Sequence, residues 1–354
     1  ELGEGADVRE KVAAICQVLD GVPLAIELAS ARTKALTLEQ IEERLNDRFR
    51  LLAGGRRGGV SRHNTLQAAV DWSYRLLEPA EAGFFERLSV FHGGFTLESA
   101  EQVAAGDGIE PWETVDWLTG LVEKSLLRFD RTSGRYDMLE TLRVYAAAKL
   151  DDRDGTAMAR DRHLEWVVGA AEANSPLRKD GAESFAWIAS EASNLTVAFD
   201  WADEDGDRAK LAEALGLHHG FTLGDPIEAL RLFDIALDGP REAGREAHLL
   251  ARRAAVLSQL DRTEEALEAG NRAVDLANGS GDEQLRSRVL RSVSVTYGAQ
   301  PMIDPGLAVS LAREAVAVAR SGDPDGLRSA LDALTWALLW VDDAFDEIEA
   351  ATAE

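Results

Sequence analysis

The sequence predicts a mainly α protein with a small helical domain, a winged helix-turn-helix domain and an α-solenoid, in that order. Three observations predict this fold class. Apolar residues recur at helical spacing through most of the chain, two short strand-like runs flank a turn at residues 131–134, and alanine-rich helical segments recur after about residue 155. The 354 residues are enough for two or three domains of ordinary size.

Residues 1–53 are predicted to form the small helical domain. Lys11–Leu19 has an apolar face at the spacing i, i+3, i+4 and i+7, made by Val12, Ile15, Cys16 and Leu19. Gly21 then ends the helix, and Pro23 suits the first turn of the next one, Leu24–Thr33. The sequence "TLEQ" from Thr37 has the form of a capping box at the start of a third helix.

Residues 54–63 are predicted to be a linker. The stretch "AGGRRGGVSR" at residues 53–62 has four glycines in ten residues, a composition typical of a flexible connection. Its arginines are suitable for contacting DNA, but a solvated loop is the stronger interpretation.

Residues 64–150 are predicted to form one compact winged helix-turn-helix domain. Four helices are expected, over Thr65–Leu77, Pro79–Val90, Leu97–Ala104 and Pro111–Lys124. The period then changes: Ser125–Leu139 has two strand-like runs around a turn at Arg131–Gly134, as in a β-hairpin. A last helix is expected over Glu140–Leu150. Helices followed by a hairpin are the outline of a winged helix-turn-helix.

Residues 151–354 are predicted to form helix pairs. The segment "EALRLFDIAL" has the Ala-x3-Phe-x2-Ala spacing of the second helix of a tetratricopeptide repeat, at Ala229, Phe233 and Ala236. The same spacing returns twice, 42 residues apart, at Ala266, Gly270 and Ala273 and at Ala308, Ala312 and Ala315. Small residues there let neighbouring helices approach closely, which predicts a TPR-like α-solenoid with long helices.

The charge of the chain is strongly negative and uneven. The formal net charge is −25, of which residues 1–150 contribute −6 and residues 151–354 contribute −19. A surface that binds nucleic acid needs a basic patch, so this balance disfavours DNA binding by the second part and favours a protein or cationic partner.

Compartment signals point to the cytoplasm. Cys16 is the single cysteine, which excludes an internal disulfide and is typical of a reducing environment. The sequence has no apolar stretch of about 20 residues and does not open with a signal peptide. Glu1 is not a methionine, so we expect the sequence to begin inside a longer protein.

The sequence contains no complete catalytic or metal site. It has no Gly-Lys pair, which a phosphate-binding loop requires, and no Gly-x-Ser-x-Gly nucleophile motif. The six histidines follow no metal-ligand spacing. We therefore expect no catalytic residues, no metal and no enzyme activity in this chain by itself.

Two tryptophans one helical turn apart, Trp336 and Trp340, have two interpretations. Packing against the preceding repeat is the simpler one. The functional alternative is an exposed platform on the binding face of the solenoid.

Three sequence blocks together resemble a known family: "DGVPLAIELASA" (20–31), the stretch from "RHNTLQAAVDWSY" to "ESAEQVA" (62–104), and "LVEKSLLRFDRTSGRYDMLETLRVYA" (121–146). They resemble the later part of signal-transduction ATPases with numerous domains (STAND), specifically bacterial transcription regulators, which are similar to the NB-ARC ATPases. The resemblance is specific over about residues 10–150 and extends further only as a repeat type.

This resemblance implies a domain order of effector, P-loop domain, helical domain, winged helix and repeat sensor, with the last three in this chain. ATP or ADP would then bind in the full-length parent with the help of an upstream P-loop domain, and not to this chain alone. Gly21 and Pro23 match the Gly-x-Pro motif, whose proline packs beside the adenine.

The relatives' Met-His-Asp motif, whose histidine contacts the β-phosphate of ADP, is not kept here. Met138, Leu139 and Glu140 stand at its place, and Leu139 cannot donate a hydrogen bond. Arg143 is the suggested substitute.

The expected groove-facing helix, Pro111–Lys124, and its flank carry four acidic residues and one lysine. Such a helix repels a DNA duplex, which favours a role as an intramolecular lever.

Three function hypotheses follow. The main one is the regulatory and sensor portion of a nucleotide-switched signal-transduction ATPase that controls transcription or another output, with repeats that bind an unidentified protein or small-molecule signal. The alternatives are a winged-helix DNA-binding regulator and a TPR-type interaction scaffold without a nucleotide role.

Overall fold

The computed structural model describes these residues: 6–19, 23–43, 69–105, 110–176, 181–203, 206–239, 242–298, 303–322, 326–339, 341 and 344–353. Gly21 and the predicted linker, 54–63, lie outside them.

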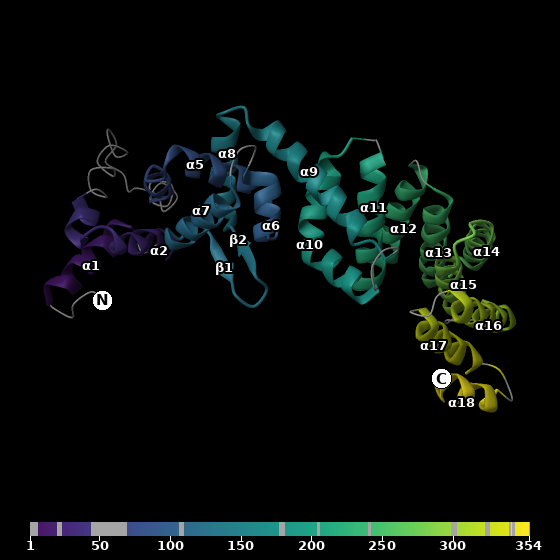
Figure 1. The fold of residues 1–354 in the computed structure, drawn as a ribbon. Helices are drawn as coiled ribbons and strands as arrows, with labels where there is room; N and C mark the ends of the chain where they lie inside the picture. The colour runs from purple at the N-terminus through teal and green to yellow at the C-terminus, as the bar shows by residue number, and fades with distance from the viewer. Residues whose placement is uncertain are drawn as a thin grey trace. The chain divides into compact units, whose positions relative to one another are not determined.

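The chain divides into two compact units, Glu1–Trp166 and Val167–Glu354. Both are built almost entirely of helices, with one two-stranded sheet in the first unit (Figure 1). The predicted mainly α fold class is therefore confirmed. In the part of the chain that the structure describes, no helix is long and apolar enough to span a membrane.

The first unit begins with the helices predicted for the small domain: α1 (Ala6–Val18), α2 (Pro23–Ala31), the 3₁₀ turn η1 (Arg32–Lys34) and a helix at 38–43. The capping box at Thr37 is confirmed: its backbone N–H donates to Gln40 Oε1 at 3.0 Å, and the Gln40 N–H donates to Thr37 Oγ1 at 3.3 Å.

The predicted buried face of α1 is wrong at one position. Ile15 and Leu19 are buried and Cys16 is half-buried, whereas Val12 is 39% exposed. Periodicity shows which residues share one face of a helix. Burial of that face also requires another element packed along its whole length. In the described residues, the face of α1 is covered only toward its C-terminal end.

The winged helix-turn-helix part follows the predicted order. Its elements are a helix at 69–74, α5 (Pro79–Arg87), η2 (Leu88–Val90), α6 (Leu97–Ala100), the π-helical turn η3 (Glu101–Ala105), α7 (Pro111–Glu123), β1 (Arg128–Asp130), β2 (Arg135–Asp137) and α8 (Glu140–Asp151). Aromatic and leucine side chains from α5 and α7 fill its core, among them Phe84, Phe85, Leu118 and Leu121.

The wing is an antiparallel hairpin in which Phe129 lies opposite Tyr136. Phe95 adds a third short stretch, because its backbone exchanges hydrogen bonds with Tyr136 at 2.9 and 2.8 Å. The turn between the strands ends at Gly134, whose φ is 68°, a conformation that favours glycine.

The second unit consists of stacked helices (Figure 1). α9 (Thr156–Ala173) crosses the boundary between the units and α10 (Gly181–Trp201) follows. The pairs are then α11 (Gly206–His218) with η4 (His219–Leu223) and α12 (Pro226–Asp238), α13 (Ala243–Gln259) with α14 (Thr263–Gly279), α15 (Glu283–Gly298) with α16 (Pro305–Gly322), and α17 (Leu327–Leu338) with α18 (Phe345–Ala353).

The small residues of the repeats lie where the sequence predicts. Together with Phe233, they lie on the second helices of three pairs, α12, α14 and α16, and all are buried: Ala229, Ala236, Ala266, Gly270, Ala273, Ala308, Ala312 and Ala315. The first helices form a row of their own, in which α13 packs against α15 and α15 against α17.

Candidate functional site

Pro23 is the first residue of α2 and is exposed. Proline suits this position because the first helical N–H needs no partner within the helix. Its predicted companion Gly21 lies outside the described residues. The start of α2 therefore presents the exposed ring of Pro23.

The other end of α2 is connected to the winged-helix part. Arg32, in the turn after α2, is buried, and its Nη2 donates to the backbone carbonyl of Ser73 at 3.3 Å. On the surface, Glu27 of α2 forms an ion pair with Arg128 of β1 at 3.7 Å. The buried contact is the stronger constraint, since an exposed ion pair contributes little.

Arg143 lies on α8 and is held by its neighbour Glu140. Arg143 Nε donates to Glu140 Oε2 at 2.7 Å and Nη2 donates to Oε1 at 2.5 Å, a bidentate pair. Arg143 Nη1 also donates to the backbone carbonyl of Ser89 at 3.5 Å.

A cavity of about 280 Å³ is lined by Arg143 together with the Met-Leu-Glu segment, Met138, Leu139 and Glu140. Asp137 and the segment from Phe91 to Phe95 form the rest of its wall. The structure thus brings Arg143 and the Met-Leu-Glu segment to one site.

His92 belongs to the same cavity, and sequence reasoning missed it. Burial, followed by the nearby charge of Arg143, lowers the pKa of His92, so the neutral ring is favoured. Its Nδ1 lies 3.2 Å from the Val90 carbonyl. No local motif surrounds His92 in the sequence, and only the fold places it beside residues 138–143.

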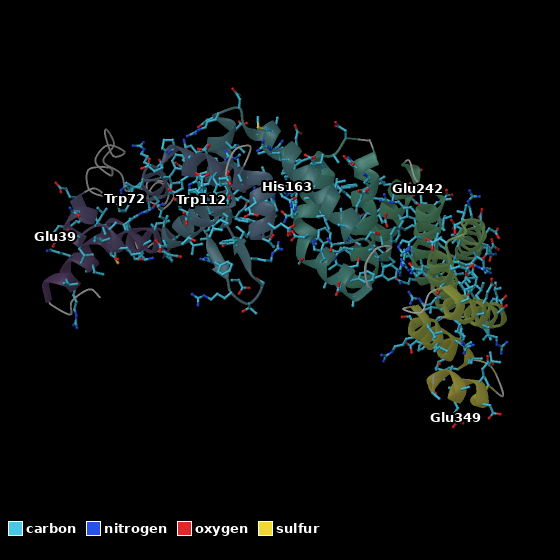
Figure 2. The ribbon with its side chains drawn as sticks, viewed as in Figure 1. Glu39, Trp72, Trp112, His163, Glu242 and Glu349 are labelled. Atoms are coloured by element: carbon cyan, nitrogen blue, oxygen red, sulfur yellow. The ribbon has the colours of Figure 1, made fainter. Side chains whose placement is uncertain are left out.

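The surface of α7 is acidic and apolar. Trp112 is 64% exposed and Val115 is 42% exposed, and Asp116 and Glu123 are exposed on the same helix (Figure 2 labels Trp112). Lys124, at its end, forms an ion pair with Glu81.

The first acidic residues of α7 have a structural role. The backbone N–H of Glu110 donates to Glu113 Oε2 at 3.0 Å, and the two form a capping box that suits the positive end of the helix dipole. Helix capping thus explains these two acidic residues without a binding partner.

Trp336 does not pack into the core, because 46% of its side chain is exposed. Trp336 shares a cavity with Val295 of the preceding repeat and is half-buried, whereas Trp340 lies outside the described residues. In those residues, no group of three or more histidine, cysteine or carboxylate side chains could hold a metal ion.

One family and several curated relatives match parts of this chain. Residues 77–151 match the family described as a winged helix-turn-helix domain. A protein of Mycobacterium tuberculosis, provisionally named an HTH-type transcriptional regulator, is 44% identical over 209 residues, which are 58% of this chain and 23% of that protein. A protein of Mycobacterium bovis with the same provisional name is equally similar.

Two further matches are partial. An uncharacterized protein of Mycobacterium tuberculosis is 44% identical over 176 residues, 48% of this chain and 45% of its own length. The crystal structure of a STAND protein with a tetratricopeptide repeat sensor from Pyrococcus horikoshii matches with a TM-score of 0.47 and 14% identity, over 93% of this chain and 53% of that one.

The chain therefore spans less than a quarter of the regulators that it matches. The matched residues 77–151 contain α5, α6, α7, the hairpin with its Phe95–Tyr136 bridge, and α8. Residues 77–151 are a winged helix-turn-helix domain, in a chain similar to regulators of that type.

Proposed function

We propose that this chain is the regulatory and sensor portion of a nucleotide-switched signal-transduction ATPase that controls transcription or another output. ATP or ADP would bind in the full-length protein, whose P-loop domain lies upstream. The repeats would bind the signal. This chain by itself would hydrolyse nothing.

The observation that carries the proposal concerns the two ends of α2: one end is exposed, and the other contacts the winged-helix part. Pro23 opens the helix with an exposed apolar surface suited to a purine, and Arg32 joins its far end to the winged-helix part at Ser73. A base held at Pro23 would therefore bias a helix that is connected to the winged helix. The base would shift the balance between two conformations if it binds one of them more tightly than the other.

Among the described residues, Arg143 is our candidate for a phosphate contact. Its guanidinium has the fork geometry that phosphate oxygens accept, and its side chain is only 18% exposed. Glu140 occupies that fork, so an incoming phosphate would compete with an existing carboxylate. His92, favoured as a neutral ring, lines the same cavity without adding a charge.

The test compares this chain with a version extended upstream through the P-loop domain, using calorimetric titration with ADP and ATP. The extended protein should bind nucleotide, and this chain alone should not. Arg143→Ala in the extended protein should weaken ADP binding about tenfold, the loss expected when a charge-assisted hydrogen bond is removed.

Arg131→Ala, an exposed change in the wing turn, is the matched control and should leave ADP binding unchanged. An extended protein that ignores both nucleotides would contradict the proposal. A scaffold without a nucleotide role predicts that outcome.

Direct DNA binding is the second candidate, and the winged helix-turn-helix match favours it. It requires a basic surface on α7, whose exposed charges are acidic. We therefore propose that the winged helix transmits a conformational change within the protein.

A further inference from the structure

The exposed side chains of α7 lie on one face of the helix, at the spacing i, i+3, i+4, i+7 and i+11. We call this face the α7 stripe, and it consists of Trp112, Val115, Asp116, Thr119 and Glu123. Thr114, Leu118 and Leu121 lie on the opposite side of α7 and are buried. The helix is therefore held in the winged-helix part by one face and presents the other to solvent.

The first half of the α7 stripe is apolar. Trp112 is 64% exposed (labelled in Figure 2), and Val115, one helical turn later, is 42% exposed. The helix does not need these contacts to form, because Pro111 and a capping box begin it and its opposite face packs into the core. Tryptophan is enriched among the residues that contribute most to protein–protein binding. An exposed tryptophan beside a second apolar side chain thus points to a protein partner.

The second half of the α7 stripe is acidic. Asp116 and Glu123 are both exposed, and Lys124, the basic residue that follows them, pairs with Glu81. A partner for this face therefore needs positive charge as well as an apolar surface.

Two arginines of the neighbouring wing also have contacts elsewhere. Arg128 forms an ion pair with Glu27 of α2, and Arg135 donates to the backbone carbonyl of Gly94. These contacts direct both cations to groups outside α7, so the charge of the α7 stripe stays negative.

The charge of the α7 stripe disfavours two other occupants. Duplex DNA is repelled by Asp116 and Glu123. In a two-fold symmetric dimer, the stripe of one copy would face the same stripe of the other, and the like charges would repel each other.

The shape of the α7 stripe suits a helix. α7 has 13 residues, so the stripe runs for about 20 Å in a straight line. The apolar face of a second helix can pack along such a line, and lysine or arginine side chains beside that face reach the carboxylates.

The cavities of the second unit are weaker candidates. In the cavity of about 620 Å³, Lys210 pairs with Glu172 at 3.0 Å and Arg245 with Glu213 at 2.7 Å. The charge of Glu213 also acts on Arg252, which lines a second cavity of about 410 Å³. These cations are thus already compensated within the protein.

We infer that the α7 stripe binds a basic amphipathic helix of a protein partner. The apolar face of that helix packs on Trp112 and Val115, and its cations pair with Asp116 and Glu123. This interaction goes beyond the proposed function and does not depend on nucleotide binding.

The test uses the whole chain and two labelled amphipathic peptides, each about four helical turns long, in fluorescence anisotropy titrations at physiological salt. One peptide has leucine at i, i+3, i+4 and i+7 of each repeat and lysine elsewhere. In the other peptide, glutamate replaces every lysine. The lysine peptide should bind, and the glutamate peptide should bind at least tenfold more weakly. Failure of the lysine peptide to bind would overturn the inference.

Variants separate the α7 stripe from the general negative charge of the chain. Trp112→Ala should weaken binding of the lysine peptide at least tenfold, as should the double variant Asp116→Lys, Glu123→Lys. The control for tryptophan is Trp336→Ala on α17, which should stay within twofold.

The control for charge is the double variant Glu264→Lys, Glu268→Lys, at two exposed positions of α14. It changes the net charge by the same amount and should weaken the lysine peptide less than threefold. Equal losses in the two double variants would show non-specific attraction and overturn the inference.

A charge exchange keeps the test independent of misfolding, because it predicts a gain. Asp116→Lys, Glu123→Lys should bind the glutamate peptide at least tenfold more tightly than the unmodified chain does. The α14 double variant should gain less than threefold. Equal gains would contradict binding at α7.

Other occupants have their own signatures. Duplex DNA binding or self-association that Trp112→Ala abolishes would overturn the inference. Loss of peptide binding in the protein extended through the P-loop domain would identify that domain as the occupant, with the same consequence. The nucleotide titration is a separate measurement, so the proposed function and this inference can fail independently.

Discussion

The hydroxyl of Tyr297 on α15 lies directly over Gly270 on α14. The hydroxyl donates to the Leu267 carbonyl at 3.0 Å. A Cβ placed on Gly270 would lie only 2.3 Å from the hydroxyl oxygen. The other repeats have Phe233 and Ala312 at the equivalent position, and this contact explains why glycine stands here.

Gly270→Ala should therefore destabilise the second unit. Alanine improves helix propensity by about 1 kcal/mol, but overpacking against a buried ring costs about 1–3 kcal/mol. The net effect should be a loss, seen as faster amide hydrogen exchange in α14 and α15. Gly169→Ala, where a Cβ would meet nothing within 4 Å, should be neutral or stabilising. Equal exchange in the two variants would contradict this explanation.

Gly94→Ala should loosen the wing. The φ of Gly94 is 85°, and a Cβ there would lie 2.7 Å from the carbonyl oxygen of Tyr136, which accepts the Phe95 hydrogen bond. Protection of the Phe95 and Tyr136 amides should fall, which hydrogen exchange measures. Gly134→Ala is the control, because it has positive φ but open space, and should cost only the backbone strain of about 1–2 kcal/mol.

Arg245→Met should expose the cost of a buried carboxylate. Glu213 is 5% exposed, and burial raises its pKa while Arg245 opposes that shift. Removing the arginine should cost about 3–5 kcal/mol at pH 7. Arg272→Met, which removes an exposed ion pair with Glu246, should change stability by less than about 1 kcal/mol.

The loss in Arg245→Met should depend on pH. The folded state holds the proton of Glu213 more tightly than the unfolded chain, so the folded state gains stability as the pH falls toward the unfolded pKa of about 4.3. Urea unfolding, monitored by hydrogen exchange in α11 and α13, should show that Arg245→Met lowers the free energy of unfolding less at pH 5 than at pH 7. A loss that grows on acidification would contradict the role of Glu213.

The chain should not bind duplex DNA at 150 mM salt. The exposed charges of α7 include Asp116 and Glu123, which repel phosphate. The double variant Asp116→Lys, Glu123→Lys should gain weak, salt-dependent binding in a fluorescence anisotropy titration. Tight binding by the unmodified chain, lost on raising the salt, would favour the DNA-binding alternative.

Much of the fold could be predicted from the sequence. The capping box at Thr37, the hairpin turn ending at Gly134 and the buried alanines of the repeats all depend on residues close together in the chain. Periodicity and turn chemistry are local properties, so they are visible before the chain is folded. The same reasoning was wrong at Val12, where burial depends on a neighbour.

The candidate sites were only partly predictable. Arg143 could be named from its place after the Met-Leu-Glu segment, but His92 joins its cavity only through the fold. Likewise, the sequence left two interpretations of Trp336 open, and the structure places it in a groove with Arg252.

The sequence by itself determined the order and type of the elements and the negative charge of the repeats. The tertiary structure alone decided which side chains share a cavity and why glycine stands at position 270. The physical reason is that helix periodicity sets the directions of side chains around one axis. Contacts between helices depend on how several axes pack, and that packing is set by the whole core.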